Sequence, residues 1–375
     1  MDRCGTGRRR SMAAGAVILL AISAAAGVYQ LLALIACLGF RRGQRPGARG
    51  NEPAVSILKP LYGVDSALRS AIASHTVLEG QYEFLCGVRD GDPAAAVVAD
   101  FPTVRLIPCS TVTPNRKVGS LIDLARAARF PILVVNDADI RVERDYLAHV
   151  TAPLSDPAVG LVTCMFRPEG DTTAARFEAL GVATDLVPSM IVARALGVKD
   201  FASGATMAFR RSDLERIGGF EAIGGYLADD YQLGHRIHSL GLKCVLSDAI
   251  VATHLGGGWG DVWRHQVRWA RTVRVSKFWG YVGLPLAFAS VWAVALIASG
   301  YWEWGLALLA VRMAMAIAGG WLVLRSPDVV RMLFLVPLRD LFTAAAWLAG
   351  LFGKTVLWRG QRLPIDREGR IQNRG

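Results

Sequence analysis

Phe130-Pro-Ile-Leu-Val-Val-Asn-Asp-Ala-Asp139 places two carboxylates directly behind an apolar run. The run predicts a buried strand, and Asp137 and Asp139 then lie in the loop at its carboxyl end. Divalent cations such as Mg²⁺ and Mn²⁺ prefer oxygen ligands and are commonly held by one or two carboxylates together with phosphate oxygens. Asp-x-Asp is a short string, however, and taken by itself it is better explained as a polar turn after a strand.

Other apolar, β-rich runs alternate with helical stretches on both sides of this segment. Strands are predicted at residues 55–58, 84–88, 104–107, 132–135 and 159–163, and helices at 67–74, 117–129 and 144–152. Strands that alternate with helices predict parallel pairing in a layered α/β sheet. Ligands of such sheets collect at the carboxyl ends of the strands, so the polar loops there are the candidate sites.

Acidic residues recur in these loops. Asp65 follows the first predicted strand, Asp90 and Asp92 follow the second, and Asp229 and Asp230 come just before a helical run. Two carboxylates in the set could bind a metal, one could hydrogen-bond a nucleotide, and another could act as a general base. Each aspartate alone is more often a cap or turn residue. Together, at strand ends of one α/β domain, they favour a nucleotide-sugar site.

The composition indicates a membrane protein. Of the 375 residues, 53% are hydrophobic, and residues 12–40 form a nearly unbroken apolar stretch without a charge. That stretch is long enough to cross the hydrocarbon core and too long for a signal peptide, which predicts an uncleaved anchor. Further apolar segments lie at about 281–299, 305–324 and 332–353. Because the last contains Pro337 and the pair Arg339-Asp340, it is predicted to be kinked, re-entrant or interfacial.

The net charge of +11 arises largely from arginines that flank the apolar segments. This distribution points to lipid headgroups and topology, and neither zinc-finger spacing nor an aromatic-interleaved basic ribbon supports a nucleic-acid partner. Two full crossings by the C-terminal segments would return the basic tail to the side of the catalytic domain, whereas three would separate them. Charge favours a tail on the cytoplasmic side.

A basic and aromatic stretch at residues 259–278 predicts a helix that lies along a membrane surface. It contains His265-Gln-Val-Arg268-Trp269. Arg268 could neutralise a leaving diphosphate, and Trp269 could form a wall of the pocket. The alternative is that both side chains anchor the helix to lipid.

Taken together, these residues resemble a known pattern. The series Asp92, Asp137-x-Asp139, Asp230 and His265-x-x-Arg268-Trp269 is similar to the "D, D, D, (Q/R)xxRW" pattern of processive and lipid-directed family 2 type glycosyltransferases. The stretches Val55-Ser-Ile-Leu-Lys-Pro-Leu-Tyr-Gly-Val-Asp65 and Trp358-Arg-Gly-Gln-Arg-Leu363 resemble ceramide glucosyltransferases, members of family 21. Gly204-Ala-Thr-Met-Ala-Phe-Arg-Arg211 and Leu227-Ala-Asp-Asp-Tyr231 resemble a bacterial branch of hopanoid biosynthesis. The resemblance runs from about residue 54 to the C-terminus.

The resemblance implies a GT-A fold with a mostly parallel sheet, a divalent cation (Mg²⁺ or Mn²⁺) and inversion at the anomeric carbon. It implies a UDP-sugar donor, UDP-glucose or UDP-N-acetylglucosamine. The implied acceptor is a lipid hydroxyl, that of ceramide or of a hopanoid such as bacteriohopanetetrol. The implied location is the bacterial inner membrane, with several spans and a cytoplasmic catalytic domain.

The resemblance also implies roles for individual residues. Asp65 and Asp92 would belong to the nucleotide-binding set, as would Asn115 and Lys117, while Asp137 and Asp139 would hold the diphosphate and its cation. Asp230 would be the base that deprotonates the acceptor hydroxyl, with His265, Arg268 and Trp269 completing the catalytic set.

Three positions depart from the pattern. His265 begins the (Q/R)xxRW motif, and a neutral imidazole does not replace a permanent cation, so Arg268 would carry more of that role. Residues 184–193 contain no histidine where animal ceramide glucosyltransferases have one, which weakens the case for ceramide. Asp139 stands where those enzymes have glycine, which favours a more conventional metal site.

The sequence thus predicts an N-terminal tail and anchor (1–40), a linker (41–53), a GT-A catalytic domain (54–250), an interface helix region with the HxxRW motif (251–280), and C-terminal membrane segments with a basic tail (281–375). Two alternatives remain beside the lipid glycosyltransferase. A processive polysaccharide synthase is disfavoured because few spans remain to form a channel. A membrane-anchored nucleotide-binding protein without activity is disfavoured because every acidic position of the pattern is present.

Overall fold

The computed structural model of the chain describes residues 3–42, 53–358 and 361–372. The chain divides into two compact units, which are described separately. The first unit comprises residues 1–43, 170–192 and 256–353, and the second comprises 44–169, 193–255 and 354–375. Residues 170–192 of the first unit lie inside the range 54–250 predicted for the catalytic domain. Most of the predicted linker, residues 43–52, lies outside the described residues.

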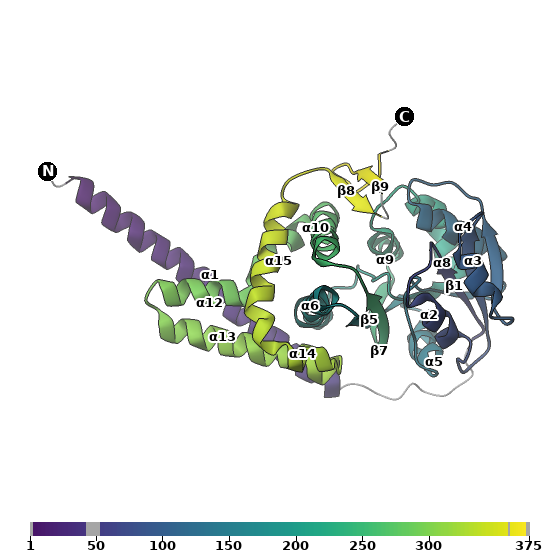
Figure 1. The fold of residues 1–375 in the computed structure, drawn as a ribbon, viewed down its shortest axis with the longest axis horizontal. Helices are drawn as coiled ribbons and strands as arrows, with labels where there is room; N and C mark the ends of the chain where they lie inside the picture. The colour runs from purple at the N-terminus through teal and green to yellow at the C-terminus, as the bar shows by residue number, and fades with distance from the viewer. Residues whose placement is uncertain (1–2, 43–52, 359–360, 373–375) are drawn as a thin grey trace. The chain divides into compact units, whose positions relative to one another are not determined.

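The second unit is built on a sheet in which, among the described residues, seven strands have the order β3-β2-β1-β4-β6-β5-β7 (Figure 1). Strands β1 to β4 pair in parallel, whereas β6 runs antiparallel to β4 and to β5. The predicted α/β class with a mostly parallel sheet is therefore confirmed. The strands are β1 (Val55–Pro60), β2 (Tyr82–Arg89), β3 (Arg105–Cys109), β4 (Ile132–Val135), β5 (Val159–Gly170), β6 (Met207–Arg210) and β7 (Lys243–Leu255).

Helices cover both faces of this sheet. On one face, α2 (Leu68–His75), α3 (Ala94–Ala99) and α5 (Tyr146–Thr151) pack on strand residues such as Ile57 and Val134. On the other face, α4 (Arg116–Ala127), α8 (Arg211–Arg216) and α9 (Asp229–Ser239) pack on Leu58 and Leu133. Because successive residues of β1 and β4 face opposite helical layers, both strands are buried at every position, as expected for a sheet covered on two sides.

Three parts of the second unit were missed by the sequence patterns. Strand β6 has four residues and ends in an arginine, and β7 contains Asp248 and His254, so neither resembles an apolar run. The C-terminal segment forms an antiparallel hairpin of β8 (Thr355–Trp358) and β9 (Gln361–Pro364), where a basic tail was predicted. The predicted helices are present, with ends displaced by one to a few residues.

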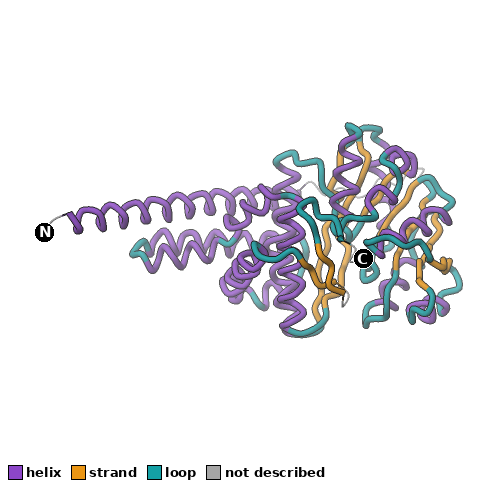
Figure 2. The backbone as a smooth tube through the Cα atoms, turned by 90° about the horizontal axis from the view of Figure 1, so that it is seen from above, coloured by secondary structure: helices purple, strands orange, loops and turns teal. Residues whose placement is uncertain are grey.

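The first unit is helical. Helices α1 (Arg3–Arg42), α12 (Ala289–Ala298) and α13 (Trp302–Ile317) run side by side (Figures 1 and 2). The other α-helices are α6 (Thr173–Gly181), α7 (Val187–Ala195, whose last residues belong to the second unit), α10 (Trp259–Ser276), α11 (Phe278–Gly283), α14 (Pro327–Arg331) and α15 (Val336–Gly350). A π-helical turn, Val182–Leu186, joins α6 to α7.

Three helical segments of the described chain are long and apolar enough to cross a membrane: Ala14–Phe40, Trp302–Val323 and Leu333–Gly350. A fourth candidate is a bent pair, Phe278–Ala287 with Ala289–Ala298, whose halves meet at 51°. The last segment was predicted to be irregular. It begins with a 3₁₀ turn at Leu333–Leu335, and Pro337 lies in the first turn of the α-helix, where its missing N–H costs no internal hydrogen bond.

Candidate functional site

Asp137 and Asp139 lie in the loop after β4, as the sequence predicts. Lys59 of β1 is fully buried and fixes this loop. Its ammonium donates to the backbone carbonyls of Asp137 at 2.9 Å and Ile140 at 3.0 Å. Burial lowers the pKa of Lys59 to about 8, an effect that nearby acidic groups partly offset. A buried ammonium thus fixes the backbone that carries both aspartates.

Lys117 joins the aspartates of two different loops. Its ammonium lies 2.8 Å from Asp137 Oδ1 and 2.8 Å from Asp229 Oδ2, and only 10% of its side chain is exposed. Burial opposes the charged form, but Asp137 and Asp229 outweigh it and raise the pKa of Lys117 above the ordinary lysine value. The sequence predicted Lys117 near a nucleotide, and the structure places this cation within the acidic cluster.

Asp230 lies beside Gly204 at the start of α9. Its Oδ2 accepts from the backbone N–H of Gly204 at 3.0 Å, and its Oδ1 accepts from that of Tyr231 at 2.8 Å. A Cβ at position 204 would lie 2.8 Å from Asp137 Oδ2, so the close approach of this loop to the acidic cluster requires glycine. Burial, followed by the charge of Asp229, raises the pKa of the Asp230 carboxyl to about 6.

Asn115 contacts the residues that carry this cluster. Its side-chain oxygen caps α4 by accepting from the N–H groups of Lys117 and Val118. Its amide donates to the carbonyl of Tyr226 at 2.8 Å and lies 3.5 Å from Asp229 Oδ1. The side chain is fully buried and its hydrogen bonds fix the start of α4 and the approach to α9, while its place in the nucleotide-binding set stays a prediction.

Asp65 and Asp92 make local backbone contacts. Asp65 Oδ1 accepts from the N–H groups of Ala67 and Leu68 at the start of α2. Both oxygens of Asp92 accept from the N–H of Gly63, and Oδ1 also accepts from Ala94. The cap and turn roles weighed in the sequence are therefore present. Asp92 additionally ties the loop after β1 to the loop after β2, and its contact with a nucleotide stays a prediction.

The donor set at the acidic loop suits a hard divalent cation. Asp137 has 40% of its side chain exposed and Asp139 Oδ2 accepts from the hydroxyl of Thr253 on β7. In the described part of the chain, no group of three or more His, Cys, Asp or Glu side chains could hold a metal by itself. Two carboxylates that leave most positions open fit an ion that takes its remaining ligands from water and a diphosphate. Asp137 and Asp139 are the residues that would hold it.

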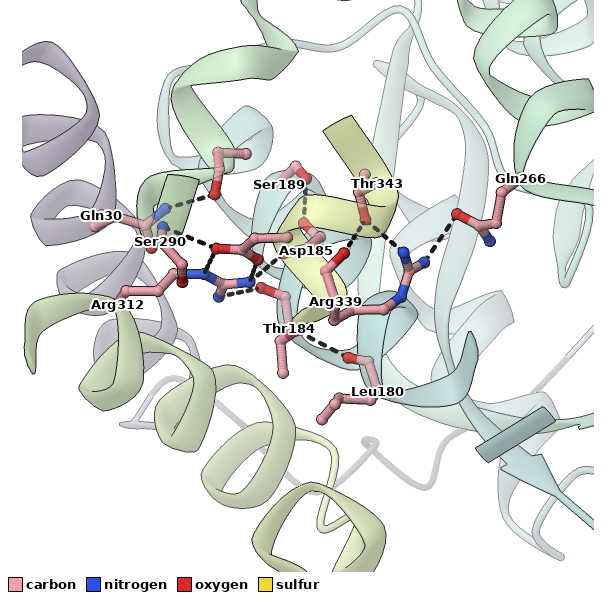
Figure 3. Close-up of polar contacts among 12 residues, drawn as sticks. Gln30, Leu180, Thr184, Asp185, Ser189, Gln266, Ser290, Arg312, Arg339 and Thr343 are labelled. Atoms are coloured by element: carbon pink, nitrogen blue, oxygen red, sulfur yellow. Dashed lines mark hydrogen bonds and ion pairs between the residues drawn. The ribbon is translucent and has the colours of Figure 1, made fainter. Parts of the chain in front are cut away.

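His265, Arg268 and Trp269 lie on α10 of the first unit. His265 Nδ1 is 2.8 Å from Glu178 Oε1 of α6, and the centroids of the His265 and Trp269 rings are 4.4 Å apart. Glu178 also accepts from Gln266 Nε2 at 2.7 Å, and Gln266 Oε1 accepts from Arg339 Nη2 at 2.9 Å (Figure 3). The structure thus gives His265 a buried acidic partner. The role of these three residues toward the acidic cluster stays a prediction.

Sequence reasoning missed Lys59, Gly204 and Glu178 as contributors to these sites. Lys59 follows directly on the apolar run of β1, and a lysine in that place is a signal for a buried, partnered charge. Gly204 gave no signal, since its need for close approach arises from carboxylates distant in sequence. Glu178 lies among apolar residues of α6, but nothing in the sequence points to α10 as its partner.

Comparison with known proteins identifies the family. The model of glycosyl transferase family 21 matches residues 16–371. The chain belongs to this family. The match confirms the predicted glycosyltransferase class and covers both the sheet domain and the apolar helices. It does not distinguish the bacterial hopanoid branch.

Two curated relatives agree with this assignment. Ceramide glucosyltransferase 1 of Caenorhabditis elegans is 30% identical over 206 residues, which are 52% of this chain and 44% of that protein. Ceramide glucosyltransferase 3 of the same organism is 30% identical over 211 residues, 52% of this chain and 45% of that protein. The matched part thus spans less than half of each relative.

A solved structure shares the fold. A mannosyltransferase from Pyrobaculum calidifontis, in complex with GDP-Man and Mn²⁺, superimposes with a TM-score of 0.54 at 20% identity. The match covers 90% of this chain and 98% of that one. At this level of identity the similarity establishes the fold, and it supports the predicted GT-A architecture with apolar N- and C-terminal helices.

Proposed function

We propose that this family 21 protein transfers one sugar from a UDP-sugar to a hydroxyl of a membrane lipid, with inversion at the anomeric carbon. The observation that carries the proposal is the cluster of Asp137, Lys117 and Asp230 at the carboxyl end of β4. It combines a partly exposed carboxylate on a loop held by Lys59, a lysine of raised pKa and a carboxylate of raised pKa. These are the groups needed to hold a diphosphate and to accept a proton beside it.

In the proposed reaction the acceptor hydroxyl attacks the anomeric carbon of the sugar. Asp230 accepts the hydroxyl proton as the new carbon–oxygen bond forms, and the bond between the sugar and the diphosphate breaks. Lys117 offsets negative charge on the departing UDP, and Arg268 is proposed to do the same. A divalent cation on Asp137 and Asp139 would supply further charge stabilisation to the leaving diphosphate. Single displacement by one base gives inversion.

A lipid acceptor is supported by the helices of the first unit and by the relatives. Candidate membrane spans lie on both sides of the sheet domain in sequence, and α10 exposes Trp259 and Trp263. Tryptophan is enriched where protein meets the membrane interface. Because the relatives are named ceramide glucosyltransferases, we propose ceramide or a hopanoid polyol such as bacteriohopanetetrol as acceptor, and UDP-glucose or UDP-N-acetylglucosamine as donor.

The fold of the second unit supports a topology with an even number of C-terminal crossings. Residues 369–371 pair with residues 225–227 inside that unit, so the C-terminal segment and the sheet lie on one side of a membrane. Trp302–Val323 and Leu333–Gly350 supply two crossings, and the bent pair then does not span. We propose that this side is the cytoplasm of a bacterial cell and that the protein resides in the inner membrane.

The pKa of Asp230 predicts an acid limit to the reaction. Because this pKa is raised to about 6, Asp230 takes up a proton as the pH falls through that value and can no longer act as a base. We expect kcat to decline about tenfold for each pH unit below the limit. Lys117→Met should move the limit to higher pH, since the lysine charge lowers the pKa of Asp230. A kcat that stays constant in purified enzyme from about pH 8 to 5 would contradict this assignment.

The proposed reaction can be tested with purified protein in lipid vesicles. UDP-glucose and UDP-N-acetylglucosamine would each be supplied with Mn²⁺ to vesicles that contain either ceramide or bacteriohopanetetrol, and products followed by mass spectrometry. We expect one donor and acceptor pair to give a monoglycosylated lipid and UDP in equal amounts. Products that carry a growing chain of sugars would instead favour a processive synthase.

A further inference from the structure

The C-terminal residues Ile365–Gln372 form a folded strap against the loop that leads into the catalytic helix α9. Ile371 N donates to the carbonyl of Gly225 at 2.8 Å, and Leu227 N donates to the carbonyl of Gly369 at 3.0 Å. Tyr226 and Arg370 face each other as an antiparallel bridge between these two hydrogen bonds. The strap therefore adds a short strand to a loop that ends one residue before Asp229.

The side chains reinforce the same contact. Arg370 Nε donates to the Tyr226 hydroxyl at 3.1 Å, and the guanidinium carbon lies 5.3 Å from the centre of the tyrosine ring. Hydrogen bonding and cation–π attraction thus act between one pair of residues. The Arg370 side chain therefore contacts residues 224–228, the catalytic loop that leads into α9.

The strap has its own internal structure. Asp366 Oδ1 accepts from the N–H groups of Glu368 and Arg370, each at 2.9 Å, and its Oδ2 accepts from Gln372 Nε2 at 2.9 Å. Gly369 has a backbone φ of 79°, which residues with a Cβ rarely adopt. Ile365 and Ile371 are both buried. The segment is a fixed turn with two apolar anchors.

The opposite side of the catalytic loop is held by Asn115. Its backbone N–H donates to the Gly224 carbonyl at 2.9 Å, and its amide donates to the Tyr226 carbonyl at 2.8 Å. The loop is thus clamped between the residue that caps α4 and the strap. Removing the strap would leave the Leu227 N–H and the Gly225 carbonyl without their partners and would free the approach to Asp229 and Asp230.

We propose that the C-terminal strap is a positioning element for Asp230, and that Arg370 is its main positioning residue. The inference rests on the proposed function, in which Asp230 is the base. A general base must lie within hydrogen-bond reach of its proton, so small displacements of α9 reduce kcat steeply.

The test compares two arginines of the strap in the full-length enzyme. Arg370→Ala removes the contact with Tyr226, whereas Arg367→Ala removes the same charge from an exposed position of the same turn. We expect Arg370→Ala to lower kcat about tenfold with little change in KM for the donor, and Arg367→Ala to match wild type. Arg370→Lys should restore part of kcat, because lysine can donate to the Tyr226 hydroxyl.

Gly369→Val provides a second variant, because a β-branched residue cannot readily adopt the positive φ of this turn. We expect it to lower kcat about a hundredfold in protein that still binds UDP. Equal kcat for wild type and Arg370→Ala would overturn the proposal. A variant that has a lower melting temperature but an unchanged kcat would overturn it as well. Absence of transfer by the wild-type enzyme would instead reject the proposed function.

Discussion

Asp230→Asn is expected to reduce kcat by about 1,000-fold, because the amide cannot accept the proton of the acceptor hydroxyl. Asparagine has nearly the same size, and its one side-chain oxygen can still accept from either the Gly204 or the Tyr231 N–H, so the fold of the loop should persist. Donor binding should also persist, because Asp137 and Lys117 remain in place. The measurement combines initial rates of transfer with titration of the UDP-sugar in the presence of Mn²⁺.

Asp100→Asn is the matched control for this substitution. Asp100 belongs to the same unit, has 51% of its side chain exposed and pairs with Arg69 at the surface. It should leave both rate and donor binding at wild-type values. Undiminished transfer by Asp230→Asn would remove this residue from the mechanism, and loss of donor binding would assign it to the donor site instead.

Arg312→Met is expected to destabilise the first unit by about 3–5 kcal/mol. Arg312 is fully buried on α13, and its guanidinium contacts Asp340 at 2.6 and 3.0 Å, Asp185 at 2.5 Å and the Thr184 carbonyl at 3.0 Å (Figure 3). The substitution would leave the buried Asp340 and the largely buried Asp185 without the guanidinium that pairs with both of them. Methionine fills a similar volume, so the loss would come from charge and hydrogen bonding rather than from a cavity.

Two further variants separate the buried charge from other effects. Arg312→Met/Asp340→Asn removes one of the stranded carboxylates and should recover part of the lost stability. Arg331→Ala removes an arginine of the same unit that is 71% exposed and pairs with Asp328 at 3.5 Å, and it should cost under about 1 kcal/mol. Unfolding of purified protein in mixed micelles measures all three. Equal stability of Arg312→Met and Arg331→Ala would show that the buried network contributes little.

Much of the sheet could be predicted from sequence because its central strands are short apolar runs. Strand β4 was predicted at residues 132–135 and is observed as Ile132–Val135, since Pro131 and the acidic loop delimit it on either side. Strand β7 could not be predicted in the same way. Its polar residues are tolerated because they lie among loops and helices of the second unit, and that environment exists only after the chain has folded.

The sequence predicted which residues belong to the candidate site, but not which of them pair with one another. Asp137 could be predicted from its place at the carboxyl end of a parallel strand, and Asp230 and Lys117 from the resemblance to the family. Their pairing could not, because Lys117 bridges residues that are distant in sequence. The same holds in the first unit, where an arginine within an apolar helix signals a buried partner but does not identify Asp185 or Asp340.

The most direct measurement of the central claim is mass spectrometry of lipid extracts from cells that express either the wild-type chain or Asp230→Asn. Hopanoid and ceramide acceptors would be supplied in turn, and equal amounts of membrane-inserted protein confirmed. The account predicts a lipid that is heavier by one hexose or one N-acetylhexosamine in cells with the wild-type chain and its absence with Asp230→Asn. A glycosylated lipid in equal amounts in both, or in neither with either acceptor, would contradict it.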